Sequence, residues 1–195
     1  MGPNPIARSK NLVWNLRRQQ GDKVFLEDVL SKKTVVIELK GHDKNAIMAE
    51  LTECLAAEKV LSDKDTFLKA IREREELEST AIGGGIAIPH AKHESVKRIF
   101  CAMGMVRDGV EFNALDGKPV HAVFMVASPP DLNREYIQVV ARAARLLKSD
   151  VMMQKIFAAS SSQEIMKVIA DFDRILHKAS VDVSTKEGRV IHKDI

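Results

Sequence analysis

The chain has few aromatic residues and few cysteines, and each shortage argues against a class of protein. Phe, Trp and Tyr make up 5% of its 195 residues, with a single Trp and a single Tyr, so we expect no surface that stacks nucleic-acid bases. Its two cysteines, Cys54 and Cys101, lie in separate segments without CxxC spacing. This arrangement argues against a disulfide framework and favours a reducing compartment, the cytoplasm.

Long apolar runs and a strong excess of one charge are also missing. No apolar run approaches the length of about 18 residues that predicts a membrane-spanning helix, and the N-terminus lacks the continuous apolar stretch of a signal peptide. The 30 Lys and Arg against 27 Asp and Glu give a net charge of +3, which is too nearly balanced to predict a polyanionic partner. We therefore expect no nucleic-acid partner and no stable insertion into a membrane.

Apolar residues, in contrast, are plentiful enough for one core. The apolar fraction of 45% suits a single domain of ordinary size with extensions. We divide the chain into a basic N-terminal extension at 1–28, a folded domain at 29–173 and a polar C-terminal tail at 174–195. The extension carries an apolar stripe around Trp14, which is typical of an arm or a short docking helix.

The pattern of apolar residues in the domain predicts a strand, then helices, then strands, then helices. This order indicates a compact α/β sandwich, a single domain in which helices flank a mixed central sheet. The predicted elements are a strand at 34–39, helices capped by Asp43 and by Ser62 or Asp63, strands at 99–106 and 120–127 with a short strand or hairpin at 109–115, a helix at 132–148, a helix capped by Asp150, and a helix after the S-x-x-E capping box at 161–164.

One segment of the domain presents a histidine in an unusual way. Residues 83–92 read Gly-Gly-Gly-Ile-Ala-Ile-Pro-His-Ala-Lys, which places His90 at the end of a short apolar strand. The glycines permit positive φ and a close approach by another molecule, and Pro89 restricts the backbone around it. Because no neighbouring Ser, Cys or Asp looks like a nucleophile in need of a base, we interpret His90 as the nucleophile itself.

The residues around His90 have the properties that phosphoryl transfer requires, which are mainly alignment and charge stabilisation. An imidazole with a pKa near roughly 6.5 is mostly neutral at pH 7 and can attack phosphorus. Backbone N–H groups at 83–85 can cradle phosphate oxygens, and the guanidinium of Arg74 can bind them. Arg74 also lies in a charged run at 72–76, however, and such runs are usually solvated helix faces.

These residues resemble the signature of a known family, the type-2 EIIA domains of the bacterial phosphotransferase system. The family includes the mannitol/fructose EIIA domains and the nitrogen-regulatory EIIA proteins, and the resemblance covers about three quarters of the chain. The segments that carry it are 74–75, Leu77, 79–80, 83–90, 116–120 and 160–165.

The resemblance implies a phosphocarrier that needs no metal, nucleotide or other cofactor. His90 would be the phosphoacceptor and Arg74 the residue that stabilises the phosphate. HPr or an HPr-like carrier would supply the phosphoryl group, and the chain would pass it to an EIIB domain or use it as a regulatory signal. Because the sequence contains no EIIB-like cysteine loop and no membrane segment, we favour the nitrogen-regulatory type.

One position departs from the family pattern. Members usually carry a second histidine, in a Glu-His-Leu segment, that helps to orient the phosphate, whereas this chain reads Glu135-Tyr136-Ile137. Tyr136 can donate a hydrogen bond but does not become a cation near pH 7. The alternative is therefore a regulatory interaction module of the same fold that cannot be phosphorylated.

Two other histidines suggest further interpretations. His121 lies in the predicted strand 120–127, where a buried or sheet-edge role is expected, but it would replace the missing histidine if it lay beside His90. His93 and His90 form a His-x-x-His pair that suggests a metal-dependent hydrolase. The sequence contains neither an H-E-x-x-H pattern nor an evident third ligand, so this hypothesis is the least favoured.

Overall fold

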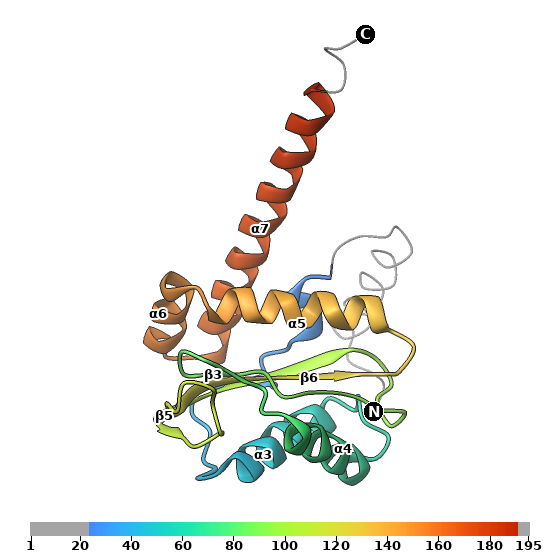
Figure 1. The fold of residues 1–195 in the computed structure, drawn as a ribbon, viewed down its shortest axis with the longest axis vertical. Coiled ribbons are helices and arrows are strands. Elements are labelled where there is room, and N and C mark those ends of the chain that lie inside the picture. Colours follow the sequence, from blue (N-terminus) through green and yellow to red (C-terminus); the bar gives the residue numbers. More distant parts are fainter. Residues whose placement is uncertain (1–23, 191–195) are drawn as a thin grey trace.

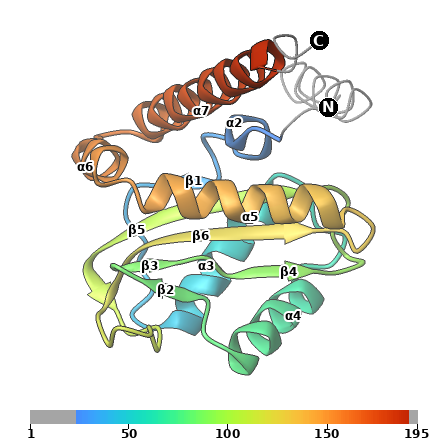
Figure 2. The same ribbon diagram turned by 45° about the horizontal axis from the view of Figure 1, so that its top comes forward.

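The computed structural model describes residues 24–190, with side chains to residue 178. These residues form a six-stranded mixed sheet with helices on both faces (Figure 1, Figure 2). The sheet order is β1-β5-β6-β3-β2, and β4 pairs with β6 beyond the end of β3. The predicted α/β sandwich with a mixed central sheet flanked by helices is confirmed.

The centre of the sheet is a long antiparallel pair, and the shorter strands add to its two sides. The strands are β1 (Val35–Val36), β2 (Ala81–Gly83), β3 (Ile86–Ala87), β4 (His90–Lys92), β5 (Phe100–Val110) and β6 (Val120–Ser128). Strand β1 runs parallel to β5, while β3 and β4 run parallel to β6, and β2 is antiparallel to β3. Strand β6 therefore touches every strand except β1 and β2.

The helices form two layers, one on each face of the sheet (Figure 2). They are α2 (Leu26–Val29), α3 (Lys44–Ala57), α4 (Lys64–Leu77), α5 (Asn133–Leu147), α6 (Asp150–Ala158) and α7 (Ser162–Val190). Helices α3 and α4 cover one face, and the other four lie on the opposite side. Within residues 24–190, no helix combines the length and apolar character that crossing a bilayer requires.

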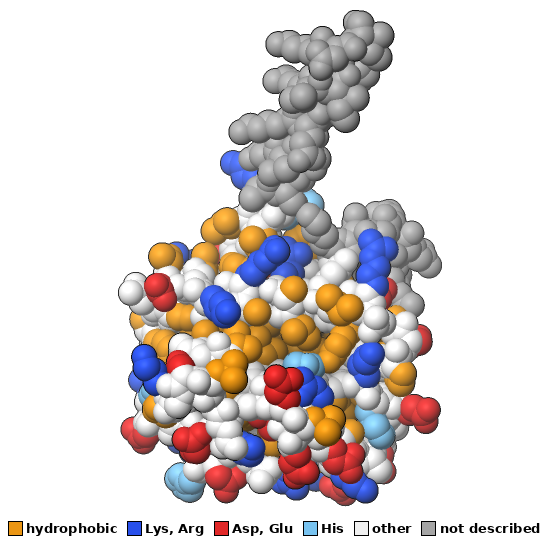
Figure 3. Space-filling model, in the orientation of Figure 1, with side chains coloured by type: hydrophobic (Ala, Val, Ile, Leu, Met, Phe, Trp, Pro, Cys, Tyr) orange, Lys and Arg blue, Asp and Glu red, His pale blue; other side chains and the backbone are white. Residues whose placement is uncertain are grey.

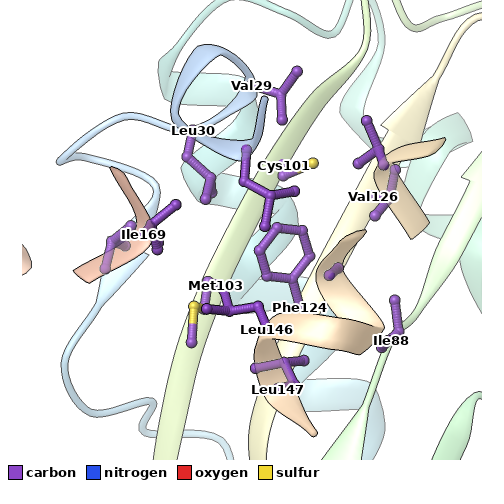
Figure 4. Close-up of a cluster of buried hydrophobic side chains, with 14 of the residues drawn as sticks. Val29, Leu30, Ile88, Cys101, Met103, Phe124, Val126, Leu146, Leu147 and Ile169 are labelled. Atoms are coloured by element: carbon purple, nitrogen blue, oxygen red, sulfur yellow. The ribbon is translucent and has the colours of Figure 1, made fainter. Parts of the chain in front are cut away.

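The sheet is buried by a hydrophobic core on each face. On the α5 side, Phe124 of β6 lies beside Leu146, in a cluster that also contains Leu147 and Ile169 (Figure 4). Each large apolar side chain that is fully buried contributes about 1.5–3 kcal/mol to folding. Strand β6 is buried at every position except His121, which is half-buried. The strand that aligns the site described below is therefore held firmly from both faces.

Helix starts follow local sequence rules. The predicted caps are confirmed at Asp43, whose carboxylate accepts from the Ala46 N–H at 2.8 Å, and at Asp63. Helix α6 differs by one residue, because Ser149 is the cap and Asp150 is the first helical residue. A carboxylate at that first position still interacts favourably with the helix dipole.

The predicted strand ending at His90 is two strands in the structure, and His90 begins the second one. Pro89 separates β3 from β4 because it has no N–H to donate to a sheet ladder. Its carbonyl still accepts from the Val126 N–H at 2.9 Å. The two short strands consequently stay aligned on β6, and His90 pairs with Val126.

Two other predicted strands also differ from the structure. Only 35–36 of the predicted strand 34–39 forms a ladder with β5, although backbone hydrogen bonds from Met103 N to Thr34 O and from Leu39 N to Met105 O hold its ends. The predicted strand or hairpin at 109–115 is the end of β5 followed by a loop. Asn113 takes a positive φ of 55° there, a conformation that no regular strand contains.

The folded part of the chain extends beyond both ends of the predicted domain, 29–173. Val24 and Leu26, inside the predicted extension 1–28, are buried in the core, while the apolar stripe around Trp14 lies outside the described residues. Helix α7 does not end at the predicted limit, Asp173, but continues to Val190 and extends away from the sheet (Figure 1). A polar composition lowers the chance of burial but does not by itself end a helix, because most polar residues other than Gly and Pro cost a helix less than about 1 kcal/mol each.

A buried ion pair joins these outer segments to the domain. Arg142 Nε of α5 lies 3.0 Å from Asp173 Oδ1 of α7, and Arg142 Nη1 donates to the Val24 carbonyl at 2.9 Å. Asp173 Oδ2 accepts from the Glu27 N–H at 3.0 Å. Burial raises the pKa of Asp173 to about 6, against the opposing effects of the Glu27 N–H and Arg142. The pair therefore anchors the segment around α2 to α5 and α7.

Candidate functional site

His90 is held at the start of β4 with its ring in one defined state. Its Nδ1 lies 2.6 Å from the carbonyl oxygen of Ile88, two residues earlier. A carbonyl oxygen can only accept, so Nδ1 carries the proton and Nε2 keeps its lone pair. The turn at Pro89 brings this carbonyl to the ring, and the backbone thereby selects Nε2 as the free nitrogen.

Arg74 faces this free nitrogen from the last turn of α4. Its Nη2 lies 3.4 Å from His90 Nε2, and its Nη1 donates to the carbonyl of Glu78 at 2.9 Å. The backbone contact orients the guanidinium, and the second nitrogen remains directed at the imidazole. Residues 74 and 90 are thus brought together as the sequence predicted, in a geometry suited to binding oxygens attached to Nε2.

Glu75 is a site residue that the sequence interpretation missed. Its side chain is buried, and both carboxylate oxygens lie 3.1 Å from the Thr80 N–H, while Oε2 accepts from Thr80 Oγ1 at 2.5 Å. The Thr80 carbonyl accepts from the Ile88 N–H at 3.0 Å. Glu75 therefore ties the end of α4 to the backbone before His90 and positions Arg74.

A signal for Glu75 was present in the helical spacing of α4. Phe67, Ile71 and Glu75 follow one another at four-residue intervals and share one helix face. The first two residues are fully buried, so the third must enter the same layer. A carboxylate at such a position requires buried hydrogen-bond donors, which Thr80 supplies.

The electrostatic surroundings keep His90 neutral. Burial lowers its pKa, and the nearby Arg74 guanidinium lowers it further. The hydrogen bond to the Ile88 carbonyl and the charge of Glu75 act in the opposite direction and do not cancel the effect of burial. At neutral pH the ring is therefore uncharged, and its Nε2 lone pair is available.

Tyr136 lies beside His90, in the first turn of α5. The two rings meet edge to face with 5.8 Å between centroids and an angle of 61°. Burial raises the pKa of the Tyr136 phenol, and the Arg74 charge opposes this only in part. The hydroxyl consequently stays protonated at neutral pH and adds no charge to the site.

Lys92 is a second residue that the sequence interpretation did not include. Its ammonium lies over the Tyr136 ring, 5.5 Å from the centroid, and donates to Asn133 Oδ1 at 2.9 Å. The sequence did contain a signal, because residues two apart on a strand point to the same face. His90 and Lys92 have this spacing on β4.

The glycines at 83–85 lie at the opposite end of β6 from His90. All three have positive φ, and the Gly84 N–H donates to Asp116 Oδ2 at 2.9 Å. The Gly85 carbonyl accepts from the His121 N–H at 2.7 Å, whereas His90 pairs with Val126. Five strand residues span about 16 Å. The prediction that these glycines cradle a phosphate on His90 is therefore wrong.

His121 is remote from His90 for the same reason. Its Nδ1 lies 3.1 Å from the Val106 carbonyl and 3.2 Å from the Arg107 carbonyl, at the start of β6. The sheet register thus separates the two histidines. The idea that His121 takes the place of the usual second histidine is wrong.

The structure does not support a metal site at His90 and His93. Nδ1 of His93 accepts from the Ser95 N–H at 3.1 Å and lies 2.8 Å from Ser95 Oγ. In the described part of the chain, no group of three or more His, Cys, Asp and Glu side chains is arranged to hold a metal ion.

Exposed apolar side chains flank the site. Leu77, at the end of α4, is 84% exposed, and Ile137, next to Tyr136 on α5, is 57% exposed. Figure 3 shows apolar side chains gathered across the middle of the molecule, between α5 and the layer of α3 and α4. A protein partner that reaches His90 would cover such side chains, since apolar area lies at the centre of most interfaces.

Comparisons with known proteins agree with this geometry. Residues 28–172 match the family described as phosphoenolpyruvate-dependent sugar phosphotransferase system, EIIA 2. The fructose-specific EIIABC component of Bacillus subtilis is 33% identical over 149 residues, which are 76% of this chain and 24% of that protein. The chain thus spans about a quarter of its length. A nitrogen regulatory protein of Bradyrhizobium diazoefficiens is 30% identical over 145 residues, 74% of this chain and 94% of that protein.

Solved structures have the same fold. The nitrogen regulatory protein IIA-Ntr of Neisseria meningitidis aligns with a TM-score of 0.68 and 28% identity, covering 73% of this chain and 97% of that one. The IIA mannitol domain in a complex with phosphorylated IIB mannitol from Escherichia coli aligns with a TM-score of 0.63 and 19% identity, covering 72% and 96%. The chain belongs to the type-2 EIIA family of the phosphotransferase system.

Proposed function

We propose that this chain is a phosphohistidine carrier in which His90 accepts a phosphoryl group from HPr or an HPr-like protein. The observation that carries the proposal is the 2.6 Å contact between His90 Nδ1 and the Ile88 carbonyl. This contact leaves Nε2 unprotonated, and Arg74 faces Nε2 at 3.4 Å. A neutral nitrogen nucleophile beside a fixed cation suits an incoming phosphoryl group.

The transfer step follows from this geometry. The Nε2 lone pair forms a bond to phosphorus while the P–N bond of the donor breaks and its electron pair returns to the donor imidazole. Nδ1 of His90 keeps its proton, so the phosphorylated ring is a cation that the Ile88 carbonyl stabilises. Arg74 balances charge on the phosphoryl oxygens. Because one P–N bond replaces another, the step is reversible.

The next partner is an EIIB domain or a regulatory target, and the nitrogen-regulatory type is favoured. Support for that type is the extent of the match, since the Bradyrhizobium nitrogen regulatory protein is covered over 94% of its length. Support for an EIIB partner comes from the IIA mannitol domain, which forms a complex with phosphorylated IIB mannitol. The free cysteines Cys54 and Cys101 favour a cytoplasmic location.

The second candidate is a regulatory interaction module that cannot be phosphorylated. The observation in its favour is Tyr136, which lies against the His90 ring and stays neutral at physiological pH. A neutral donor stabilises a phosphoryl dianion less than a cation does, typically by about 1–2 kcal/mol.

Incubation of the full chain with a phosphorylated HPr-type carrier separates the two candidates. We expect an acid-labile adduct with the ³¹P chemical shift of Nε2-phosphohistidine in the wild type, and no adduct in His90→Ala. The matched control is His121→Gln, which removes the imidazole at the other end of β6 and keeps the adduct. A wild type that never gains the adduct contradicts the carrier and supports the interaction module.

A further inference from the structure

Lys92 has no part in the function proposed above, although it lies close to His90. We propose that Lys92 is a further catalytic residue, whose ammonium binds the phosphoryl oxygens on the side of the site opposite Arg74. The inference rests on the proposed phosphorylation of His90. It assigns to this chain a phosphate clamp made of one arginine from α4 and one lysine from β4.

The strand geometry directs Lys92 and His90 to the same face. Ala91, between them, is buried in the core on the α3 and α4 side. Side chains alternate along a strand, so those of His90 and Lys92 point toward α5. Residues two apart on a strand lie about 6.6 Å from each other, and a lysine side chain can readily cross that distance.

Two contacts hold the Lys92 ammonium against α5, at the same tyrosine that touches the His90 ring. It donates to Asn133 Oδ1 at 2.9 Å and lies over the Tyr136 ring, 5.5 Å from the centroid. The His90 ring is 5.8 Å from the centroid of that same tyrosine ring. Tyr136 therefore has the nucleophile on one side and the lysine on another. The amide of Asn133 engages one of three ammonium donors, so the others can bind phosphoryl oxygens.

Before the P–N bond forms, the incoming phosphoryl group meets a neutral His90 ring, because the ring becomes a cation only on phosphorylation. A phosphoryl group brings nearly two negative charges and three strong acceptor oxygens. Arg74 provides one positive charge, and the neutral Tyr136 hydroxyl provides none. The negative charge of the buried Glu75, which follows Arg74 in the sequence, is engaged by the Thr80 hydroxyl. Lys92 supplies a second positive charge to the incoming group from the α5 side.

The test is the single-turnover rate of His90 phosphorylation by a phosphorylated HPr-type carrier. We expect Lys92→Met to lower the rate about tenfold or more, and Lys92→Arg to keep most of it. The matched control is Lys118→Met, which removes the same charge in the turn beside Asp116, at the glycine end of the sheet. This control keeps the wild-type rate.

A ³¹P titration of the phosphorylated protein gives a readout that a purely structural role would not change. A nearby cation favours the phosphoryl dianion, so loss of Lys92 raises the second pKa of the phosphohistidine group. Tyr136→His, assayed at pH 6 where an imidazole is largely protonated, then restores the rate of Lys92→Met. If Lys92→Met and Lys92→Arg are both folded by circular dichroism and both lose the phosphorylation rate, the role of Lys92 is structural and the inference is overturned.

The failure of this inference differs from the failure of the proposed function. If Lys92→Met gains the adduct at the wild-type rate with an unchanged ³¹P titration, Lys92 is not catalytic, while the wild-type adduct still supports a carrier. If the wild type gains no adduct, the proposed function fails and the phosphate clamp fails with it.

Discussion

A histidine beside glycine or proline lies at each end of strand β6, and the two histidines have different surroundings. Near the C-terminal end, His90 has one nitrogen on a carbonyl and the other facing Arg74. Near the N-terminal end, His121 Nδ1 lies against the carbonyls of Val106 and Arg107. The two histidines each have Nδ1 at a backbone carbonyl, and the arginine that faces Nε2 is what makes His90 the candidate nucleophile.

The glycines belong to the second of these ends. A Cβ added at Gly85 would lie 3.3 Å from His121 Cδ2, and one at Gly109 would lie 2.8 Å from His121 Cε1. These glycines therefore make room for the His121 ring and allow a tight hairpin. The most conspicuous part of the sequence, the three consecutive glycines, therefore belongs to the far end of β6 and does not lie beside His90.

The largest effect on the phosphorylation rate is expected at Arg74, the residue that distinguishes the surroundings of His90 from those of His121. Arg74→Gln removes the cation that faces His90 Nε2 and should lower the single-turnover phosphorylation rate about 100-fold, or about 2.7 kcal/mol of transition-state stabilisation. Rapid-quench measurements with a phosphorylated HPr-type carrier determine the rate.

A neighbouring arginine of α4 serves as the control for this variant. Arg72 Nη2 lies 3.4 Å from the carbonyl of Asn45, so it is engaged away from His90. Arg72→Gln removes the same charge from the same helix and should change the rate less than about twofold, the usual size of a surface substitution. Equal losses in the two variants would show that general positive charge matters and that Arg74 has no special position.

A smaller effect, on stability alone, is expected at the glycine end. Gly109 has a φ of +76°, and an added Cβ would lie 2.8 Å from both His121 Cε1 and Pro119 Cβ. Gly109→Ala should lower the free energy of unfolding by about 2–3 kcal/mol, because backbone strain adds to overpacking. Chemical denaturation measures this change.

Gly84→Ala is the matched variant, since Gly84 has a φ of +65° but no heavy atom within 4 Å of an added Cβ. Its cost should be about 1 kcal/mol, from the backbone alone. The folded fraction of both variants should be phosphorylated at the wild-type rate. A folded Gly84→Ala protein that fails to accept the phosphoryl group would place the glycines in the site and reverse the comparison.

The smallest effect concerns the titration of His90. Burial and Arg74 lower its pKa, so the neutral ring persists at neutral pH and is lost only as pH falls through the lowered value. The phosphorylation rate should follow this protonation, and Arg74→Gln should shift the loss to higher pH. The imidazole ¹H–¹³C signals provide the pKa directly by NMR. A His90 pKa above the usual value of roughly 6.5 would contradict the proposed surroundings.

Some features of the fold were predictable because their causes are local. Caps such as Asp43 and Asp63 act on N–H groups two or three residues away. The remoteness of His121 from His90 was not predictable in this way, because it depends on which residues of β6 pair with β3 and β4. The continuation of α7 past Asp173 was missed because the polar composition after Asp173 was interpreted as a tail.

The order of the elements, the α/β class, the family resemblance and the candidate residues His90 and Arg74 could all be derived from the amino-acid sequence. The free nitrogen Nε2, the placement of Tyr136 and Lys92 on the α5 side of the site, and the position of the glycine hairpin at the far end of the sheet required the folded chain. These features depend on the register of the sheet. Each residue along a strand moves a side chain about 3.3 Å, and the pairing that sets this position comes from contacts between segments far apart in the chain.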